Sequence, residues 1–256
     1  MSDGWGLALL IGFAFATAGL VKGVVGLGLP TVAIGLLSLA MAPVEAAALL
    51  IVPSLVTNVW QMVAGPALRL VTRRLATMMV GVFIGTLLTI GVLTGASSTL
   101  ATAGLGAILA LYGAWGLWGR GLTVRRTAEP LLSPLTGLLT GLVAGGTGVF
   151  AVPAVPYLGG LGMSKEELIQ SLGLAFTVGT VALATGLALN GALHRTAAAG
   201  SLLAVLPAAL GMAAGQRLRH HLAPDTFRRG FYIALVALGV VMVVRALGPA
   251  VGAAGH

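Results

Sequence analysis

A single cation lies inside an otherwise apolar, glycine-rich stretch near the start of the chain. Residues 19–30 read GLVKGVVGLGLP, in which Lys22 precedes three glycines and a proline: Gly23, Gly26, Gly28 and Pro30. Glycines permit a helix to break, and proline suits the first turn of the next helix. The free amides of that new helix would point into the break, where small anions are commonly held. With the charge of Lys22 beside it, the stretch is a candidate anion site.

Two interpretations of Lys22 stay open. It could end a helix and extend its ammonium to the headgroup layer, as long basic side chains do. It could instead face an anion pathway, because an ionisable residue within a membrane is a functional candidate by default. The glycine spacing, G-x-x-G-x-G with no preceding strand, matches neither the dinucleotide fingerprint nor a phosphate-binding Walker loop.

A second copy of the motif occurs at residues 141–153, GLVAGGTGVFAVP. Ala144 stands where the first copy has Lys22, so one cation would serve both breaks. The residues of this copy that we predict to bind substrate are Gly145, Gly146, Thr147 and Gly148.

Polar residues also share one face of the third apolar segment of each half. Ser54, Thr57, Asn58 and Gln61 are spaced i, i+3, i+4 and i+7. The corresponding segment of the second half contains Gln170, Thr177 and Thr180. Such faces can line a pathway or hydrogen-bond neighbouring helices. Both uses stay open, and the residues predicted to complete the substrate site are Asn58, Gln61, Gln170 and Thr177.

The remaining polar residues suggest no catalysis. Glu45 and Glu167 are predicted to cap the helices they begin, where a carboxylate complements the helix dipole. The histidines have no metal-site spacing, and the chain contains no cysteine. Serine or cysteine with a nearby base, H-E-x-x-H and paired aspartates are absent from the apolar segments. We therefore predict no enzyme activity, no metal and no cofactor.

The elements that position these residues are apolar helices. With 58% hydrophobic and 8% charged residues, the chain is an all-α integral membrane protein in lipid contact. Its net charge of +8 lies in connectors, so orientation in the membrane explains it better than nucleic acid does. The ten predicted apolar segments are 5–21, 29–41, 44–63, 75–93, 98–119, 131–144, 149–159, 167–189, 198–216 and 229–247.

The two halves of the chain repeat one plan. Gly19, Gly23, Gly26 and Glu45 recur at a constant offset of 122 residues as Gly141, Gly145, Gly148 and Glu167. We predict two repeats, 1–126 and 127–256, each made of a short broken helical hairpin and three transmembrane helices. G-x-x-x-G pairs at 19/23, 81/85, 141/145 and 211/215 are expected to allow close helix crossing.

The basic residues set the predicted orientation. When the first two segments of each half are counted as a hairpin, twelve of the fourteen Lys and Arg residues fall on one side. Only Arg195 and Arg245 fall on the other. The positive-inside rule then makes the repeats inverted, with both termini on the non-cytoplasmic side of a multi-pass inner membrane protein.

Residues 19–61 and 141–180 resemble the two halves of the sulfite exporter (TauE/SafE) family. Together with the matching glycine pairs, this resemblance covers essentially the full chain. The resemblance implies a permease for small sulfur-containing anions such as sulfite or sulfonates, with the family's glycine motif on Gly19, Gly23, Gly26 and Gly28. Many members have Gly-Gly before the proline, where this chain has GLGLP and GVFAVP.

We therefore predict an exporter that works by alternating access around the two breaks. Its partners would be a small anion and the lipid bilayer, with no nucleic acid, and a homodimer is compatible with this plan. The alternative is a non-transporting membrane subunit that assembles or anchors other proteins.

Overall fold

The all-α fold is confirmed. The computed structural model describes residues 2–95, 98–119, 121–193, 195–219 and 224–253, in which no strand occurs. Besides a short 3-10 turn at Arg126–Ala128, the helices are α1 (Ser2–Val25), α2 (Leu29–Leu37), α3 (Pro43–Val63), α4 (Leu68–Gly95), α5 (Ser98–Trp118), α6 (Glu129–Thr147), α7 (Ala154–Gly159), α8 (Lys165–Leu189), α9 (Arg195–Leu203), α10 (Val205–Leu218) and α11 (Pro224–Ala253).

Three segments differ from the predicted bounds. α1 contributes a 20-residue apolar span, Gly6–Val25, and is thus not the short helix that we predicted. Residues 149–153 lie outside any helix, so the second motif is followed only by the six-residue α7. The predicted segment 198–216 is divided between α9 and α10 at Ala204. Pro207 explains that division, because it lacks the N–H that a continuous helix would pair with Leu203.

Seven helices among the described residues are long and apolar enough to cross a membrane. They include α1, α3, α4, α5, α8 and α11, together with residues 199–218. α6 is not among them.

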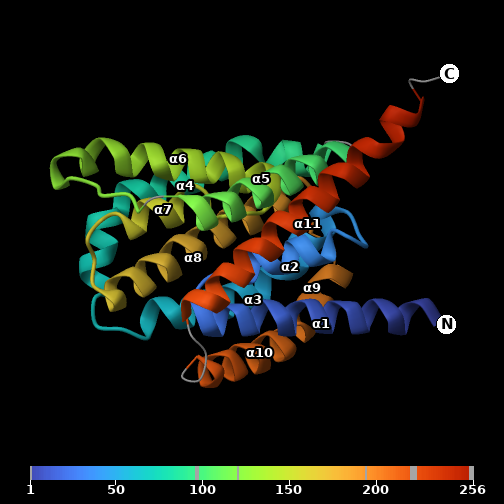
Figure 1. The fold of residues 1–256 in the computed structure, drawn as a ribbon, viewed down its shortest axis with the longest axis horizontal. Helices are drawn as coiled ribbons and strands as arrows, with labels where there is room; N and C mark the ends of the chain where they lie inside the picture. Colours follow the sequence, from blue (N-terminus) through green and yellow to red (C-terminus); the bar gives the residue numbers. More distant parts are fainter. Residues whose placement is uncertain (1, 96–97, 120, 194, 220–223, 254–256) are drawn as a thin grey trace.

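The helices pack in corresponding pairs from the two halves. α1 packs along α10, and its counterpart α6 packs along α4. α3 packs against α8, and α5 packs against α11. Figure 1 shows α6, α4 and α5 along one side of the bundle and α1 with α10 along the other. The first turn of α1 and the last described turn of α11 lie toward the same end.

Small residues make these close pairs, as predicted. A side chain on Gly19 or Gly23 would overlap the backbone of α10 at Ala208 or Met212. The matching contacts of α6 are made by Gly141 and Gly145 against the backbone of α4. The glycines of α4 and α10 at 81, 85, 211 and 215 meet the backbones of α6 and α1 in the same manner.

Both breaks begin with the same backbone turn. Gly26 and Gly148 have φ of 83° and 75°, a left-handed conformation that side chains disfavour. Their N–H groups donate to the carbonyls of Lys22 and Ala144, each at 2.7 Å. The two motifs thus end their helices alike, 122 residues apart.

Candidate functional site

Lys22 points into the protein. It occupies the last turn of α1, and its side chain is only 2% exposed. Its Nζ donates to Thr57 Oγ1 at 3.2 Å and also to Asn58 Oδ1. In this structure the ammonium therefore does not extend to a headgroup layer, which was the alternative from sequence.

The acceptors of Lys22 are set by the shape of α3. Pro53 lies inside this helix and cannot donate a backbone hydrogen bond. Just before it, the Val52 N–H donates to Ser201 Oγ of α9 at 3.0 Å. One turn after it, the Thr57 hydroxyl donates to the Pro53 carbonyl at 2.8 Å, which leaves a lone pair of Thr57 Oγ1 for Lys22.

Two glutamines tie the break to the centre of the fold. Gln61 Nε2 donates to the carbonyls of Gly26 and Ile169, at 2.9 and 3.0 Å. Gln170 Nε2 donates to the carbonyls of Met62 and Gly65, both at 2.8 Å. Gln61 therefore holds the α1–α2 break against α8, whereas Gln170 holds the end of α3.

A cavity of about 240 Å³ adjoins Lys22. It lies where α1, α3 and α10 end and where α8 begins. Five predicted site residues line it, namely Lys22, Gly23, Gly26, Gln61 and Gln170. The lining also contains one further cation, Arg219, and one anion, Glu166, together with Gln216 of α10. The net positive lining suits a small anion better than a cation.

Three buried polar atoms of α3 have no partner among the described residues. They are Asn58 Nδ2, Gln61 Oε1 and Ser54 Oγ. Buried polar groups nearly always have a partner, so each such atom needs an explanation. The Asn58 amide is next to the Lys22 ammonium, since it carries the oxygen that Lys22 contacts. An N–H₂ donor and an ammonium side by side can both donate hydrogen bonds to an oxyanion.

The other predicted site residues do not line this cavity. Gly28 caps the start of α2 and faces Phe231. Gly145 and Gly146 lie against α4 at Thr86 and Val92. The Thr147 and Thr177 hydroxyls donate within their own helices, to Val143 and Gly173.

Packing closes the second break. A side chain on Gly148 would clash with Ile34 of α2. Val149, Phe150 and Ala151 are all buried there in the hydrophobic core. The backbone of this break resembles that of the first, but apolar side chains fill its surroundings.

The predicted caps are present. Glu45 accepts from the Ala42 N–H at 3.3 Å, and Glu167 accepts from the Ser164 N–H at 2.8 Å. The Ser164 hydroxyl accepts from the Glu167 N–H at 3.2 Å, which completes a capping box.

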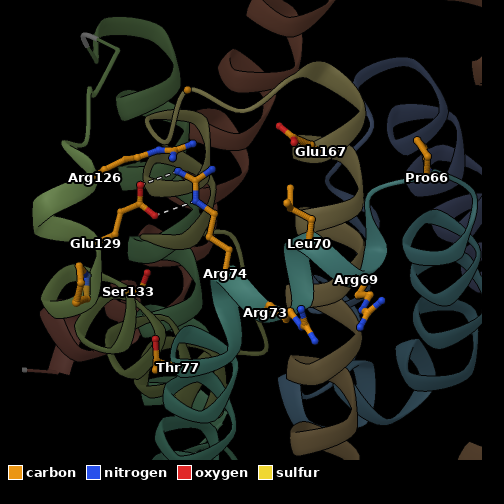
Figure 2. Close-up of a pocket in the computed structure, with 12 residues that line it drawn as sticks. Pro66, Arg69, Leu70, Arg73, Arg74, Thr77, Arg126, Glu129, Ser133 and Glu167 are labelled. Atoms are coloured by element: carbon orange, nitrogen blue, oxygen red, sulfur yellow. Dashed lines mark hydrogen bonds and ion pairs between the residues drawn. The ribbon is translucent and has the colours of Figure 1, made fainter.

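A second polar cavity was missed from sequence. It is lined by Arg69, Arg73, Arg74, Arg126, Glu129 and Glu167, among others (Figure 2). In the sequence, these arginines indicate only the orientation of the protein in the membrane. A usable signal was present, because Arg69 and Arg73 are four residues apart and so share a helix face.

One ion pair organises this second cavity. Arg74 Nε and Nη2 donate to the two carboxylate oxygens of Glu129 at 2.8 and 2.6 Å, and Nη2 also donates to the Leu161 carbonyl at 3.1 Å. The hydrogen bond from Arg74 lowers the pKa of the Glu129 carboxyl, which lies outside the seven long apolar helices. The pair joins α4 of the first half to α6 of the second.

Comparison with known proteins identifies the family. The family model described as Sulfite exporter TauE/SafE matches residues 10–242. The chain belongs to this family. It is therefore a multi-pass membrane transporter and not an enzyme. No curated protein and no solved structure matches the chain. In the described residues, no three His, Asp or Glu side chains come together to hold a metal ion.

Proposed function

We propose that this TauE/SafE protein exports small sulfur-containing anions, such as sulfite or sulfonates, across the inner membrane. One observation carries the proposal: the buried ammonium of Lys22 lines a small cavity and contacts Asn58, whose Nδ2 donor has no partner among the described residues. Isolated buried charge is costly, so a site of this kind is best explained by an anion that neutralises it.

The substrate would bind between α1, α3 and α8. Lys22 Nζ supplies the charge, the Asn58 amide supplies a directed donor, and Gln61 fixes the position of the Gly26 backbone. Gly26 keeps its part of the wall free of side chains, because the space where its side chain would stand is open, so a small anion can approach the backbone. Gln170 and the second break would contribute indirectly, by holding in place the helices that surround the substrate.

The cavity has an inward-facing position in this proposal. It lies at the helix ends that carry Lys165, Arg217 and Arg219, which the charge bias assigns to the cytoplasm. The first turn of α1 and the last described turn of α11 lie toward the other end of the bundle, which supports a non-cytoplasmic location for that end (Figure 1).

Alternating access would come from movement of the two inverted repeats, 1–126 and 127–256, about the centre. Support comes from the matching pairs α1–α10 and α6–α4, and from α1 and α6 entering the bundle from opposite ends (Figure 1). In a cell that is negative inside, each exported monovalent anion gains about 2.3 kcal/mol per 100 mV. The membrane potential alone could therefore drive export.

The test is flux in proteoliposomes under an imposed potential. Purified protein is given sulfite, thiosulfate, sulfoacetate, taurine, sulfate or a carboxylate, with empty liposomes as the control. We expect saturable sulfite or sulfonate flux that follows the potential and persists with a protonophore. Loss of flux with the protonophore would indicate proton coupling instead. Absence of flux for every anion would contradict the proposal and favour a non-transporting assembly or anchoring subunit.

A further inference from the structure

The arginine-lined cavity is separate from the Lys22 cavity and shares no lining residue with it. Its volume is about 1090 Å³. It is bounded by the start of α4, by the turn that leads into α6 and by the start of α8. It therefore lies at the same end of the bundle as the Lys22 cavity, where the charge bias places the cytoplasm.

The charges of this cavity are unbalanced. The lining contains four arginines and two carboxylates. One of these carboxylates, Glu129, already accepts two hydrogen bonds from Arg74. Arg69 and Arg73 are exposed and make no ion pair or hydrogen bond with another residue in the described part of the chain. Like charges four residues apart on a helix repel each other. An external anion would relieve that repulsion.

The surroundings indicate what kind of anion fits. Two guanidinium groups on one helix face suit phosphate, which arginine binds in a bidentate manner. An apolar side chain lies between the two arginines in the cavity lining: Leu70 of α4 is 54% exposed. A free small oxyanion would leave Leu70 and most of the cavity uncovered. A phospholipid would cover them with its glycerol and acyl chains.

We propose that this cavity binds the phosphodiester headgroup of an anionic phospholipid from the cytoplasmic leaflet. Arg69 and Arg73 hold the phosphate, and Arg126 adds charge beside the Arg74–Glu129 pair (Figure 2). Acyl chains lie along the exposed Leu70 of α4. Basic pockets between helices on the cytoplasmic side are suited to such headgroups. The lipid thereby bridges the two halves where Arg74 already joins them.

Native mass spectrometry of the purified full chain tests this directly. Protein is exchanged into detergent micelles containing equal amounts of phosphatidylglycerol and phosphatidylcholine, and the retained lipids are counted. We expect preferential retention of phosphatidylglycerol. The double variant Arg69→Gln/Arg73→Gln should lower that retention about tenfold or more, because each basic side chain near the surface contributes to the attraction. Arg69→Lys/Arg73→Lys keeps the charge and should retain an intermediate amount.

A matched control removes two charges elsewhere. Lys165→Gln/Arg229→Gln changes exposed cations that do not line the cavity and should retain lipid like the wild type. Melting temperatures confirm that each variant is folded, and the Lys variant decides the matter if the Gln variant is not. Equal retention of both lipids, or unchanged retention in the Gln variant, would overturn the proposal. So would binding of inorganic phosphate to the arginines without any lipid preference.

Discussion

The two helix breaks begin with the same backbone turn but have different surroundings. At the first, Gly26 ends α1, and the neighbouring polar groups are Lys22, Asn58 and Gln61. At the second, Gly148 ends α6 with the same turn, but Ile34 and buried core residues fill the space. A duplicated scaffold thus supplies two equivalent turns, and only one of them carries polar chemistry.

Residues at the constant offset of 122 show how that difference is encoded. Lys22 corresponds to Ala144, and Gln61 corresponds to Leu183. Asn58 corresponds to Thr180, whose hydroxyl donates to the Phe176 carbonyl of its own helix at 2.6 Å. At these three positions the second half therefore keeps the helix geometry and lacks the polar groups that surround the first break. The asymmetry favours one anion site for the whole protein.

The largest effect should be common to both breaks, because their helix packing is shared. Gly23→Leu and Gly145→Leu each push a side chain into the backbone of the neighbouring helix. We expect each to lower the free energy of unfolding by about 3 kcal/mol, the upper end for overpacking. Gly12→Ala, with nothing near its added carbon, should be neutral. Thermal unfolding in detergent measures this, and a mild effect in only one of the two variants would break the structural equivalence.

A smaller effect should separate the two breaks. Asn58→Leu deprives the buried Lys22 ammonium of an acceptor, at a cost of about 2 kcal/mol. Thr180→Val removes only a bond within its own helix and should cost about 0.5 kcal/mol. The same unfolding assay compares them. If the two variants lose equal free energy of unfolding, the contact between Lys22 and Asn58 does not stabilise the fold more than a hydrogen bond within one helix.

A smaller difference between the two breaks concerns the turns themselves. Gly26→Ala and Gly148→Ala both place a side chain at positive φ, which costs about 1–2 kcal/mol. Gly148→Ala should cost about 1 kcal/mol more, because its side chain also displaces Ile34. Ile34→Val removes the methyl group concerned, so in that background the two alanine variants should be equal. A double-mutant cycle measures this, and an unchanged difference would contradict the packing explanation.

Much of the fold followed from the sequence. The apolar segments, the glycine-based crossings and the caps at Glu45 and Glu167 depend on local composition and spacing, so they were predictable. The full length of α1 was not, because the predicted segment ended at residue 21, before the charge of Lys22, whereas the helix continues through Lys22 to Val25. The division at Ala204 depends on Pro207, a signal that we did not use.

The site was only partly predictable. The cavity contains five of the residues predicted for the site, namely Lys22, Gly23, Gly26, Gln61 and Gln170. The glycine motif and the spacing of polar residues along the helices indicated these positions. The sequence could not indicate that Lys22 contacts Asn58, since the rotation of α1 is set by its contact with α10. Nor could it indicate that Ile34 closes the second break, because that contact joins residues from different halves. The arginine cavity was missed because charge in connectors was counted without regard to helix faces.

The measurement that tests the central claim most directly is sulfite flux by Lys22→Met in proteoliposomes, at the same imposed potential as the wild type. Methionine keeps the length of the side chain and removes its charge, and a matched Arg229→Gln variant removes a charge away from the cavity. Thermal unfolding confirms that both are folded. We predict that Lys22→Met lowers sulfite flux about tenfold or more, because a charged hydrogen bond is worth about 1.5–3 kcal/mol. Arg229→Gln should transport like the wild type. Wild-type flux in a folded Lys22→Met protein would contradict the account.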